Sequence, residues 1–544
     1  MTDSPTLAEA IMAAFKARGV KRIFGIPGGG SSLDLIDAAG RRDIDFVLTR
    51  GETAAAIMAA VTAELTGAPG VVLTGIGPGA ASVVNGIAYA SLERAPVVAI
   101  TDAREPEAGT APHQVFDQQA LFAPITKASR RLTPEDGAQI VEELLDRALA
   151  LPPGPVHVDL SATDAGSPVS VTVAAPAAGR GEPADPNPGT VEGEIEAARG
   201  LLSESRRPVV VAGIEARAGG TGSALRRLVE TLGCPAMTTY KAKGVIADDH
   251  PQTIGHFTGA RSEVEALAQK ESKADLIVFV GLDPVELIPA PWFLEAPVLA
   301  LTAQSGPTFP AAPAARLHGP LGLCVEVVAE AAVESDWTEA ELGALRRHLR
   351  DRLRLEGKGH TAESVTEAAA ALAPKSARVT VDAGAHMFSI MALWRAAAPY
   401  DVLKSTGLST MGFALPAGIA AALAEPERPV IAFTGDGGLL MCLAELSTAA
   451  RLGCNLTVVV LNDAALTLID VKQQRQQRPP SGVRYPAVDF AAAARGLGCQ
   501  AWTVGREDAL EPALRAAFAH QGPTLVDVTI DPSGYGAQLT ALRG

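Results

Sequence analysis

The sequence predicts an α/β protein with three doubly wound parallel-sheet domains. Three observations lead to this prediction: an alternation of strand and helix patterns, the length of the chain, and two breaks in composition. Short β-branched runs are each followed by a glycine-bearing turn and an Ala/Leu-rich helical pattern, which is typical of parallel sheets with crossover helices. The clearest runs lie at 22–30, 70–80, 207–216, 274–283, 428–438 and 456–463.

The length and the breaks give the domain boundaries. The chain has 544 residues, and one hydrophobic core rarely grows past about 250–300 residues. Residues 161–189 are rich in Pro, Gly and Ala and lack periodicity, which is typical of a linker. A charged helical stretch at 337–357 runs into Gly-Lys-Gly. We therefore expect domains at 1–165, 190–335 and 360–544.

Composition narrows the class of function. The formal net charge of -15 argues against a nucleic-acid partner or an anionic membrane surface, because both reward clustered Lys and Arg. The sequence has no uninterrupted apolar stretch of about 20 residues to span a bilayer, and its first residues lack a signal-peptide pattern. The five cysteines have no CxxC spacing, so neither a disulfide framework nor a zinc site is expected. We expect a cytoplasmic enzyme that acts on a small molecule.

The segment 428–463 carries the strongest chemical signal. One predicted strand runs into GDGG at 435–438, and the next ends at Asn462 and Asp463, which lies 27 residues after Asp436. Both acids then reach the carboxyl edge of one βαβ unit, where open α/β sheets bind ligands. Two carboxylates and a main-chain carbonyl suit Mg²⁺, and the following helix N-terminus offers N–H groups to a diphosphate. The alternative is a plain Asp-Gly turn in which Asp436 caps the helix.

GDGG followed by LND closely resembles the signature of thiamine diphosphate (ThDP) enzymes. Other segments are similar, in order, to those of the acetolactate synthase-like subfamily: RIFGIPGGG, GIGPGAASVVNGIAYA, HQVFDQ and STGLSTMGFALPAGIAAAL. The resemblance spans almost the whole chain and implies a pyrimidine-binding domain, a central domain and a diphosphate-binding domain in that order. It also implies ThDP and Mg²⁺ as cofactors, and a decarboxylase or carboligase acting on a 2-oxo acid.

The resemblance assigns the cofactor and metal residues. The side chains of Asp436 and Asp463 and the carbonyl of Ala465 are implied Mg²⁺ ligands, with Asp463 in a place where the family usually has Asn. The implied cofactor-binding set is Pro27, Glu52, Gly384, Ala385, His386, Gly407, Leu408, Met411, Gly435, Gly437, Gly438, Asp463 and Leu466. Met411 matches the apolar residue that supports the bent cofactor, and His386 matches a segment that contacts the diphosphate. An ordinary core methionine and a capping or core histidine are the alternatives.

Glu52 matches the position of the family's single essential glutamate, which hydrogen-bonds the aminopyrimidine ring. Apolar neighbours at 54–58 are expected to bury it and raise its pKa; a solvent-facing glutamate at a helix start is the alternative. Gln114 and His113 are the candidate catalytic groups near the substrate, although His113 also suits a surface loop. Because Glu52 and GDGG lie in different domains, the resemblance implies that they meet across the interface of a homodimer or homotetramer.

Departures from the subfamily leave the substrate open. Leu466, Thr467 and Lys472 stand where acetolactate synthases carry a Tyr-Gly or Gln-Gly pair and an aromatic residue. A ThDP-dependent 2-hydroxyacyl-CoA lyase or oxidase is therefore the alternative. Lys472, Gln473 and Arg475 indicate a polar or anionic substrate, or otherwise a solvated helix face.

Three further alternatives concern other cofactors or no catalysis. FAD or an adenine nucleotide could occupy the central domain, although glycines after strands are routine in α/β folds. The segment 75–80 fits a dinucleotide fingerprint, which would suit an NAD-dependent dehydrogenase. A catalytically silent protein with the ThDP fold is the last alternative, and retention of Glu52 and both acids argues against it.

Overall fold

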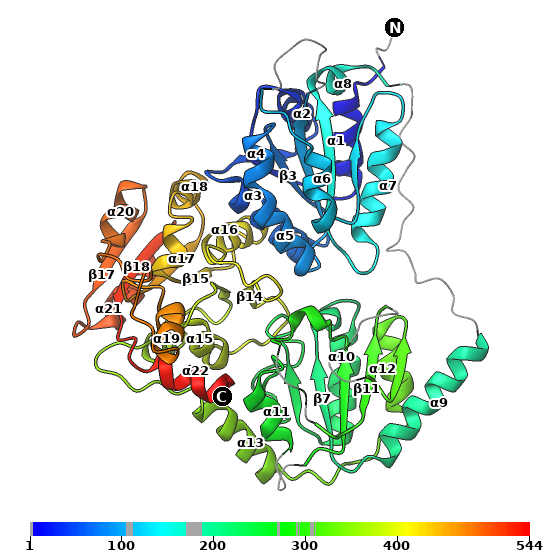
Figure 1. Cartoon of the computed structure of the whole chain (residues 1–544), viewed down its shortest axis with the longest axis vertical. Helices are drawn as coiled ribbons and strands as arrows, with labels where there is room; N and C mark the ends of the chain where they lie inside the picture. Colours follow the sequence, from blue (N-terminus) through cyan, green and yellow to red (C-terminus); the bar gives the residue numbers. More distant parts are fainter. Residues whose placement is uncertain are drawn as a thin grey trace.

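The computed structural model describes residues 4–104, 113–169, 188–268, 273–289, 292, 294–304, 309 and 312–543. Within these residues it contains three sheets of six strands each, and every pairing between their strands is parallel. The three sheets form separate bodies along the chain (Figure 1). The predicted α/β class with three parallel sheets is confirmed. Most of the expected linker, residues 170–187, lies outside the described residues.

The first sheet has the strand order β2-β1-β3-β4-β6-β5. Its strands are β1 (Arg22–Ile26), β2 (Asp45–Leu48), β3 (Gly70–Thr74), β4 (Val97–Ala103), β5 (Ser129–Arg131) and β6 (Val156–Ser161). Its helices are α1 (Leu7–Ala17), α2 (Ser31–Gly40), α3 (Glu52–Thr66), α4 (Pro78–Ser82), α5 (Val84–Leu92), α6 (Gln118–Phe122), α7 (Gly137–Leu149) and α8 (Ala162–Gly166). Strand β3 is buried throughout, as its unbroken apolar sequence requires in a sheet covered on both faces. The strand order reverses between β1 and β3.

The central sheet has the strand order β12-β11-β10-β7-β8-β9 and reverses between β10 and β7. Its strands are β7 (Pro208–Ala212), β8 (Ala236–Thr238), β9 (Thr253–His256), β10 (Leu276–Val280), β11 (Val298–Thr302) and β12 (Ala315–His318). Its helices are α9 (Pro188–Glu204), α10 (Thr221–Leu232), α11 (Arg261–Ala268) and α12 (Leu321–Ala329). The charged stretch that follows forms α13 (Glu339–Asp351).

The third sheet has the strand order β14-β13-β15-β16-β18-β17 and reverses between β13 and β15. Its strands are β13 (Arg378–Val381), β14 (Val402–Lys404), β15 (Val430–Gly435), β16 (Leu456–Asn462), β17 (Gln500–Val504) and β18 (Thr524–Thr529). Its helices are α14 (Ala362–Leu372), α15 (Met387–Leu393), α16 (Ala414–Ala424), α17 (Asp436–Leu440), α18 (Glu445–Leu452), α19 (Thr467–Arg475), α20 (Phe490–Gly496), α21 (Leu510–Ala519) and α22 (Tyr535–Arg543). None of the helices in the described ranges is long and apolar enough to cross a membrane.

Helices α3 and α16 pack against each other and join the first and third sheets into one hydrophobic core (Figure 1). Both helices consist largely of alanine, so their backbones can approach closely. Helix α5 also packs tightly on α3, because a Cβ added at Gly86 of α5 would lie 2.4 Å from the Ala56 Cβ. The start of α3, at Glu52, is therefore held firmly relative to the third sheet.

A buried cluster of charges joins all three sheets. The Lys241 Nζ, in the turn after β8, lies 3.0 Å from the Glu64 carboxylate on α3 and 3.1 Å from the Glu93 carboxylate at the end of α5. The Arg217 guanidinium, beside β7, lies 2.9 Å from Glu64. Burial alone would raise the pKa of Glu64, but Lys241 and Arg217 hold that pKa below its usual range. The two cations thus keep a buried carboxylate ionised at the domain junction.

We predict that Lys241→Met destabilises the protein by about 3–5 kcal/mol, because it leaves Glu64 and Glu93 short of a buried partner. The measurement is the shift in the denaturant midpoint and in Tm. Lys273→Met is the matched control, since its ammonium lies 3.9 Å from Glu295 and both side chains are exposed; it should change stability by less than about 1 kcal/mol. Equal shifts for the two variants would contradict the assigned role of the cluster.

Candidate functional site

The candidate site lies where the strand order of the third sheet reverses, at the carboxyl ends of β13 and β15. Such switch points are the usual ligand crevices of open α/β sheets. Strand β13 leads into the segment 382–386, and β15 leads into Asp436 at the start of α17. The GDGG motif and His386 therefore come together from segments about 50 residues apart in the sequence.

Asp436 is 2% exposed. Its Oδ1 accepts the Gly437 N–H at 2.9 Å, while its Oδ2 is buried and accepts no hydrogen bond from the described residues. A buried carboxylate oxygen is costly unless something compensates it. The geometry therefore favours a cation or a donor from a ligand at this oxygen.

Asp463 lies close enough to Asp436 for the two charges to interact. Burial raises the pKa of Asp463 to about 7, and the neighbouring Asp436 carboxylate adds to this effect. The Thr467 hydroxyl donates to the Asp463 Oδ2 at 2.7 Å. Within the described residues there is no group of three or more His, Cys, Asp or Glu side chains that could hold a metal. A cation here would rely on two carboxylates, on main-chain oxygen and on oxygens of a ligand, which is the donor set that Mg²⁺ prefers.

Three side chains surround Gly437 and leave no room for a side chain at this position. A Cβ added there would lie 2.5 Å from the Leu466 Cδ2, 3.0 Å from the Tyr485 Oη and 3.6 Å from the Met411 Cε. The structure therefore places Met411 and Leu466 beside the GDGG turn. Any larger residue at position 437 would push these three side chains away from the backbone of the turn.

Tyr485 is a component of the site that sequence reasoning missed. Its segment pairs with the residues after Asp463, because the Tyr485 N–H donates to the Ala464 carbonyl at 3.2 Å and Ala465 forms an antiparallel bridge with Arg484. Burial, followed by the charge of Asp436, raises the pKa of the phenol above its usual range. The neutral phenol thus lies beside the two acids. No sequence motif marks Tyr485 as part of the site. Its place there follows only from the contact between its segment and the residues about 20 positions earlier.

His386 fills a space that two glycines leave open. A Cβ at Gly384 would lie 2.6 Å from the imidazole Cε1, and one at Gly435 would lie 3.2 Å from it. The ring is 5% exposed, and burial lowers the pKa of His386 to about 3, so the imidazole is neutral. Its Nε2 has no partner in the described part of the chain, which leaves it able to bond a ligand. Ala385 is also buried.

Asp382 fixes the loop that carries Met411. Its carboxylate accepts the N–H groups of Gly412 at 3.1 Å and Phe413 at 3.3 Å. It also accepts the Thr434 hydroxyl, just before the GDGG motif, at 2.9 Å. One buried carboxylate therefore ties the Met411 loop to strand β15.

The preceding part of this loop is held by the first domain. Glu93 accepts the Gly407 N–H at 2.9 Å, and a Cβ at Gly407 would lie 2.5 Å from the Leu92 carbonyl oxygen. Leu408 is half-buried and packs against the core shared with α3. Gly407 and Leu408 thus lie at the contact between the first and third sheets.

Glu52 begins α3 and is half-buried. The two N–H groups before it, from Arg50 and Gly51, donate to the Glu445 carboxylate of α18 at 2.8 and 3.0 Å. Within the described residues, no hydrogen bond or ion pair joins Glu52 to Asp436 or to any other residue of the GDGG turn.

The loop residues of the first domain lie near Gly77, at the carboxyl edge of its sheet. Gln114 is exposed and has a φ of 61°, and a Cβ at Gly77 would lie 2.7 Å from its carbonyl oxygen. His113 and Pro27 are exposed. Gln118, which sequence reasoning missed, is buried and accepts the Gly77 N–H at 3.1 Å. This anchors the Gly77 turn and the loop to the sheet.

Two of the polar residues on α19 bind neighbouring segments of the chain. Gln473 accepts the Ser481 N–H at 3.1 Å and donates to its carbonyl at 3.0 Å, and Arg475 donates to the Gly536 carbonyl at 3.2 Å. Lys472 is exposed. These contacts favour the solvated helix face over a role in substrate binding.

The crevice of the central sheet, between β7 and β10, is filled by acidic side chains. Glu286 accepts the N–H groups of Ile214 at 2.9 Å and Asp283 at 3.2 Å. Glu215 accepts the Ala303 N–H at 2.8 Å. Burial raises the pKa of Glu286 to about 7. Main-chain donors that could bind a phosphate are thus already bonded to carboxylates.

Comparison with known proteins gives matches over most of the chain. Models of thiamine pyrophosphate enzymes match as the N-terminal TPP binding domain over residues 5–121, the central domain over 195–296 and the C-terminal TPP binding domain over 382–528. An acetolactate synthase of Bacillus subtilis (strain 168) is 29% identical over 97% of this chain and 93% of its own length. A probable acetolactate synthase large subunit of Methanocaldococcus jannaschii is 30% identical over 97% and 92%. A probable 2-ketoarginine decarboxylase of Pseudomonas aeruginosa is 30% identical over 96% and 94%.

We predict that Asp382→Ala destabilises the protein by about 3 kcal/mol or more, because it leaves several buried donors unpaired. Hydrogen exchange at the amides of Gly412 and Phe413 should become faster, and Tm should fall. Asp489→Ala is the control: the exposed Asp489 accepts one helix-end N–H, from Ala492, and its loss should cost about 1 kcal/mol. Unchanged exchange at Gly412 would show that Asp382 does not hold this loop.

Proposed function

Because the chain belongs to the acetolactate synthase-like family of thiamine diphosphate-dependent enzymes, we propose that it uses ThDP and Mg²⁺ to break or form the carbon–carbon bond beside the carbonyl of a 2-oxo acid. When bound, ThDP supplies a carbon nucleophile and an electron sink for the fragment that remains. The observation that carries the proposal is the crevice of the third sheet, where Asp436, Asp463 and His386 meet around glycines.

The residues of this crevice fit the two groups. Asp436 and Asp463, with the Ala465 carbonyl, would hold Mg²⁺, and the unpartnered Oδ2 of Asp436 supports this. The N–H groups at the start of α17 and the neutral His386 imidazole would bind the diphosphate. The space around Gly437, which a side chain would fill, supports close approach of the cofactor to the backbone.

The remaining residues would hold the reactive part of the cofactor in position. Met411 and Leu466 would support its bend, with Gly407 and Leu408 at the edge of the same loop. Gly384, Ala385, Gly435 and Gly438 would line the diphosphate end, and Pro27 the pyrimidine end. Glu52 would hold a proton at the pyrimidine ring, and Gln114 and His113 would contact the substrate.

We further propose that the complete site forms between two chains. Glu52 and the acidic pair lie in different domains of the chain, and the family resemblance, in which these domains meet across a subunit interface, supports a homodimer or a homotetramer built from such dimers. The proposed domains are 1–165, 190–335 and 360–544. The cysteines are free thiols, which supports a cytoplasmic location. The acidic crevice of the central sheet supports the absence of FAD or another nucleotide there.

The substrate is proposed only as a 2-oxo acid. The relatives named above include acetolactate synthases and a probable 2-ketoarginine decarboxylase, so both carboligation and decarboxylation need testing. Incubation with ThDP and Mg²⁺ and a panel of pyruvate, glyoxylate, aromatic and basic 2-oxo acids should release CO₂ from at least one of them. Product mass then separates ligation from simple decarboxylation. Absence of ThDP-dependent turnover across the panel, with ThDP bound, would contradict the proposal.

We predict that Glu52→Gln lowers kcat by at least about 100-fold, because the carboxyl group can no longer exchange a proton with the pyrimidine ring. ThDP binding and Tm should change little, since the Glu52 side chain makes no hydrogen bond to any other residue that the structure describes. The exposed Glu427 gives the control, and Glu427→Gln should keep full turnover. Unchanged turnover in Glu52→Gln would favour a catalytically silent protein.

We predict that Asp463→Asn preserves or tightens binding of Mg²⁺ and ThDP, because it removes one charge beside an anionic diphosphate. The pH dependence should also change. The Asp463 carboxyl, with its pKa of about 7, must lose its proton to bind Mg²⁺, so affinity of the parent protein should weaken as pH falls below 7, by up to about tenfold per unit. Titrations at pH 6 and 8 test this, and a large loss of affinity in Asp463→Asn at pH 8 would rule the idea out.

A further inference from the structure

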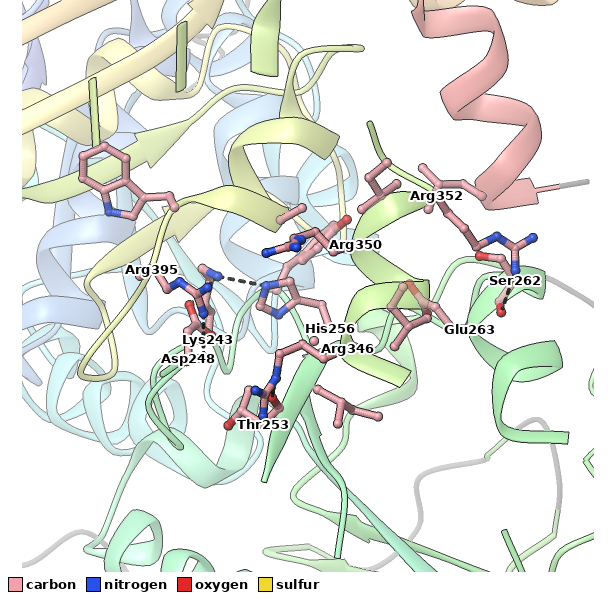
Figure 2. Close-up of a pocket in the computed structure, with 18 residues that line it drawn as sticks. Lys243, Asp248, Thr253, His256, Ser262, Glu263, Arg346, Arg350, Arg352 and Arg395 are labelled. Atoms are coloured by element: carbon pink, nitrogen blue, oxygen red, sulfur yellow. Dashed lines mark hydrogen bonds and ion pairs between the residues drawn. The ribbon is translucent and has the colours of Figure 1, made fainter. Parts of the chain in front are cut away.

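A second pocket lies between the central and third sheets and is lined by several cations. Its walls come from the segment 240–263, from helix α13 and from the end of α15. Arg395 lies at one end of the group and Arg352 at the other, with Arg346 and Arg350 between them (Figure 2). Arg346 and Arg350 are four residues apart on α13 and therefore point to the same side of this helix.

Three of these guanidinium groups bond to main-chain oxygen. Arg346 donates to the Thr253 carbonyl at 2.9 Å, Arg352 to the Ser262 carbonyl at 3.4 Å, and Arg395 to the Asp248 carbonyl at 3.0 Å. In the described ranges, none of the three forms an ion pair with a carboxylate. Their positive charge is therefore oriented by the fold but not neutralised by it.

The acids of the pocket bind neighbouring donors, although the buried Asp248 Oδ1 has no hydrogen-bond partner in the described residues. Asp248 lies 2.5 Å from the Lys243 Nζ, and both side chains are at most 7% exposed. Glu263 accepts the Thr258 N–H at 2.5 Å and the Thr258 hydroxyl at 3.0 Å. His256 bonds the Lys243 ammonium at 2.8 Å, and burial lowers the pKa of this histidine to about 4, so the imidazole is neutral and accepts. The excess of positive charge comes from the arginines.

We propose that this pocket binds a small phosphate-bearing anion. Oriented guanidinium groups are suited to tetrahedral oxyanions. Three of the four have no carboxylate partner in the described residues, and the fourth, Arg350, pairs only with the exposed Asp351 at 3.9 Å. The apolar lining residues Ile254, Leu349 and Trp394 suit an organic group on the phosphate. The occupant is therefore a phosphate ester rather than inorganic phosphate alone.

The pocket has a direct structural link to the crevice of the third sheet. Helix α15 starts beside His386 and ends at Leu393, next to Trp394 and Arg395 of the pocket. The Lys243 ammonium donates to the Met391 carbonyl on this helix at 3.1 Å. A ligand bound to the arginines would therefore contact the far end of the helix that begins at the candidate diphosphate site.

The test is calorimetric titration of the protein, saturated with ThDP and Mg²⁺ in a buffer without phosphate, with inorganic phosphate and with phenyl phosphate. We expect both to bind with phenyl phosphate the tighter, and we expect Arg395→Gln and Arg350→Gln each to weaken binding at least tenfold. In the described part of the chain, Arg350 makes no hydrogen bond to the main chain and pairs only with the exposed Asp351 at 3.9 Å, so its variant keeps the test valid if Arg395→Gln folds poorly. Arg347→Gln, on the same helix and outside the pocket, is the matched control.

The outcomes separate this pocket from the cofactor site. Binding that is lost in the Arg350 and Arg395 variants and kept in the Arg347 variant supports the proposal. Binding that persists in both pocket variants, or that disappears only when the ThDP concentration is raised, places the anion elsewhere and overturns it. No measurable binding of either probe at 10 mM, about ten-thousandfold weaker than a micromolar metabolite site, overturns it as well.

Discussion

The packing of α3 on α16 is the constraint on which the arrangement of the candidate site depends. Helix α3 begins at Glu52, and α16 begins at Ala414, three residues after Met411. Because both helices are rich in alanine, they can pack closely, and their contact leaves little room for adjustment. Two polar contacts reinforce it at the ends: Glu445 binds the turn before Glu52, and Glu93 binds Gly407 in the loop before α16.

Buried carboxylates hold the loops of the site by accepting hydrogen bonds from main-chain N–H groups. Glu445, Glu93 and Asp382 each accept main-chain N–H groups from a loop of a different segment. A carboxylate in such a place is expensive to bury, and its cost is offset only when the loop delivers its donors in the right geometry. Each of these loops therefore has one stable position, which depends on the fold of both domains rather than on its own sequence.

Sequence reasoning succeeded where the signal is local. The GDGG turn and Asp463 end adjacent strands of one βαβ unit, so their meeting at one sheet edge follows from strand order alone. Sequence reasoning did not identify three residues of the site: Tyr485, Asp382 and Gln118. Each contacts a turn that is distant in the sequence, and none belongs to a motif. The Met411 and Leu466 assignments depended on resemblance, and the structure places both side chains beside Gly437. The roles of Gln114 and His113 concern a substrate, which the geometry of one chain does not fix.

Helix α15 links the proposed anion pocket to the proposed diphosphate crevice. The helix has seven residues, or about 10 Å of length at 1.5 Å per residue, so the two places lie close together. The net charge of -15 repels anions at long range, and neither place can rely on a general positive field. Each proposed site would instead depend on fixed local donors: helix N–H groups and His386 at one, and arginines bonded to main-chain oxygen at the other. Recognition at the two proposed sites would therefore be a matter of short-range geometry.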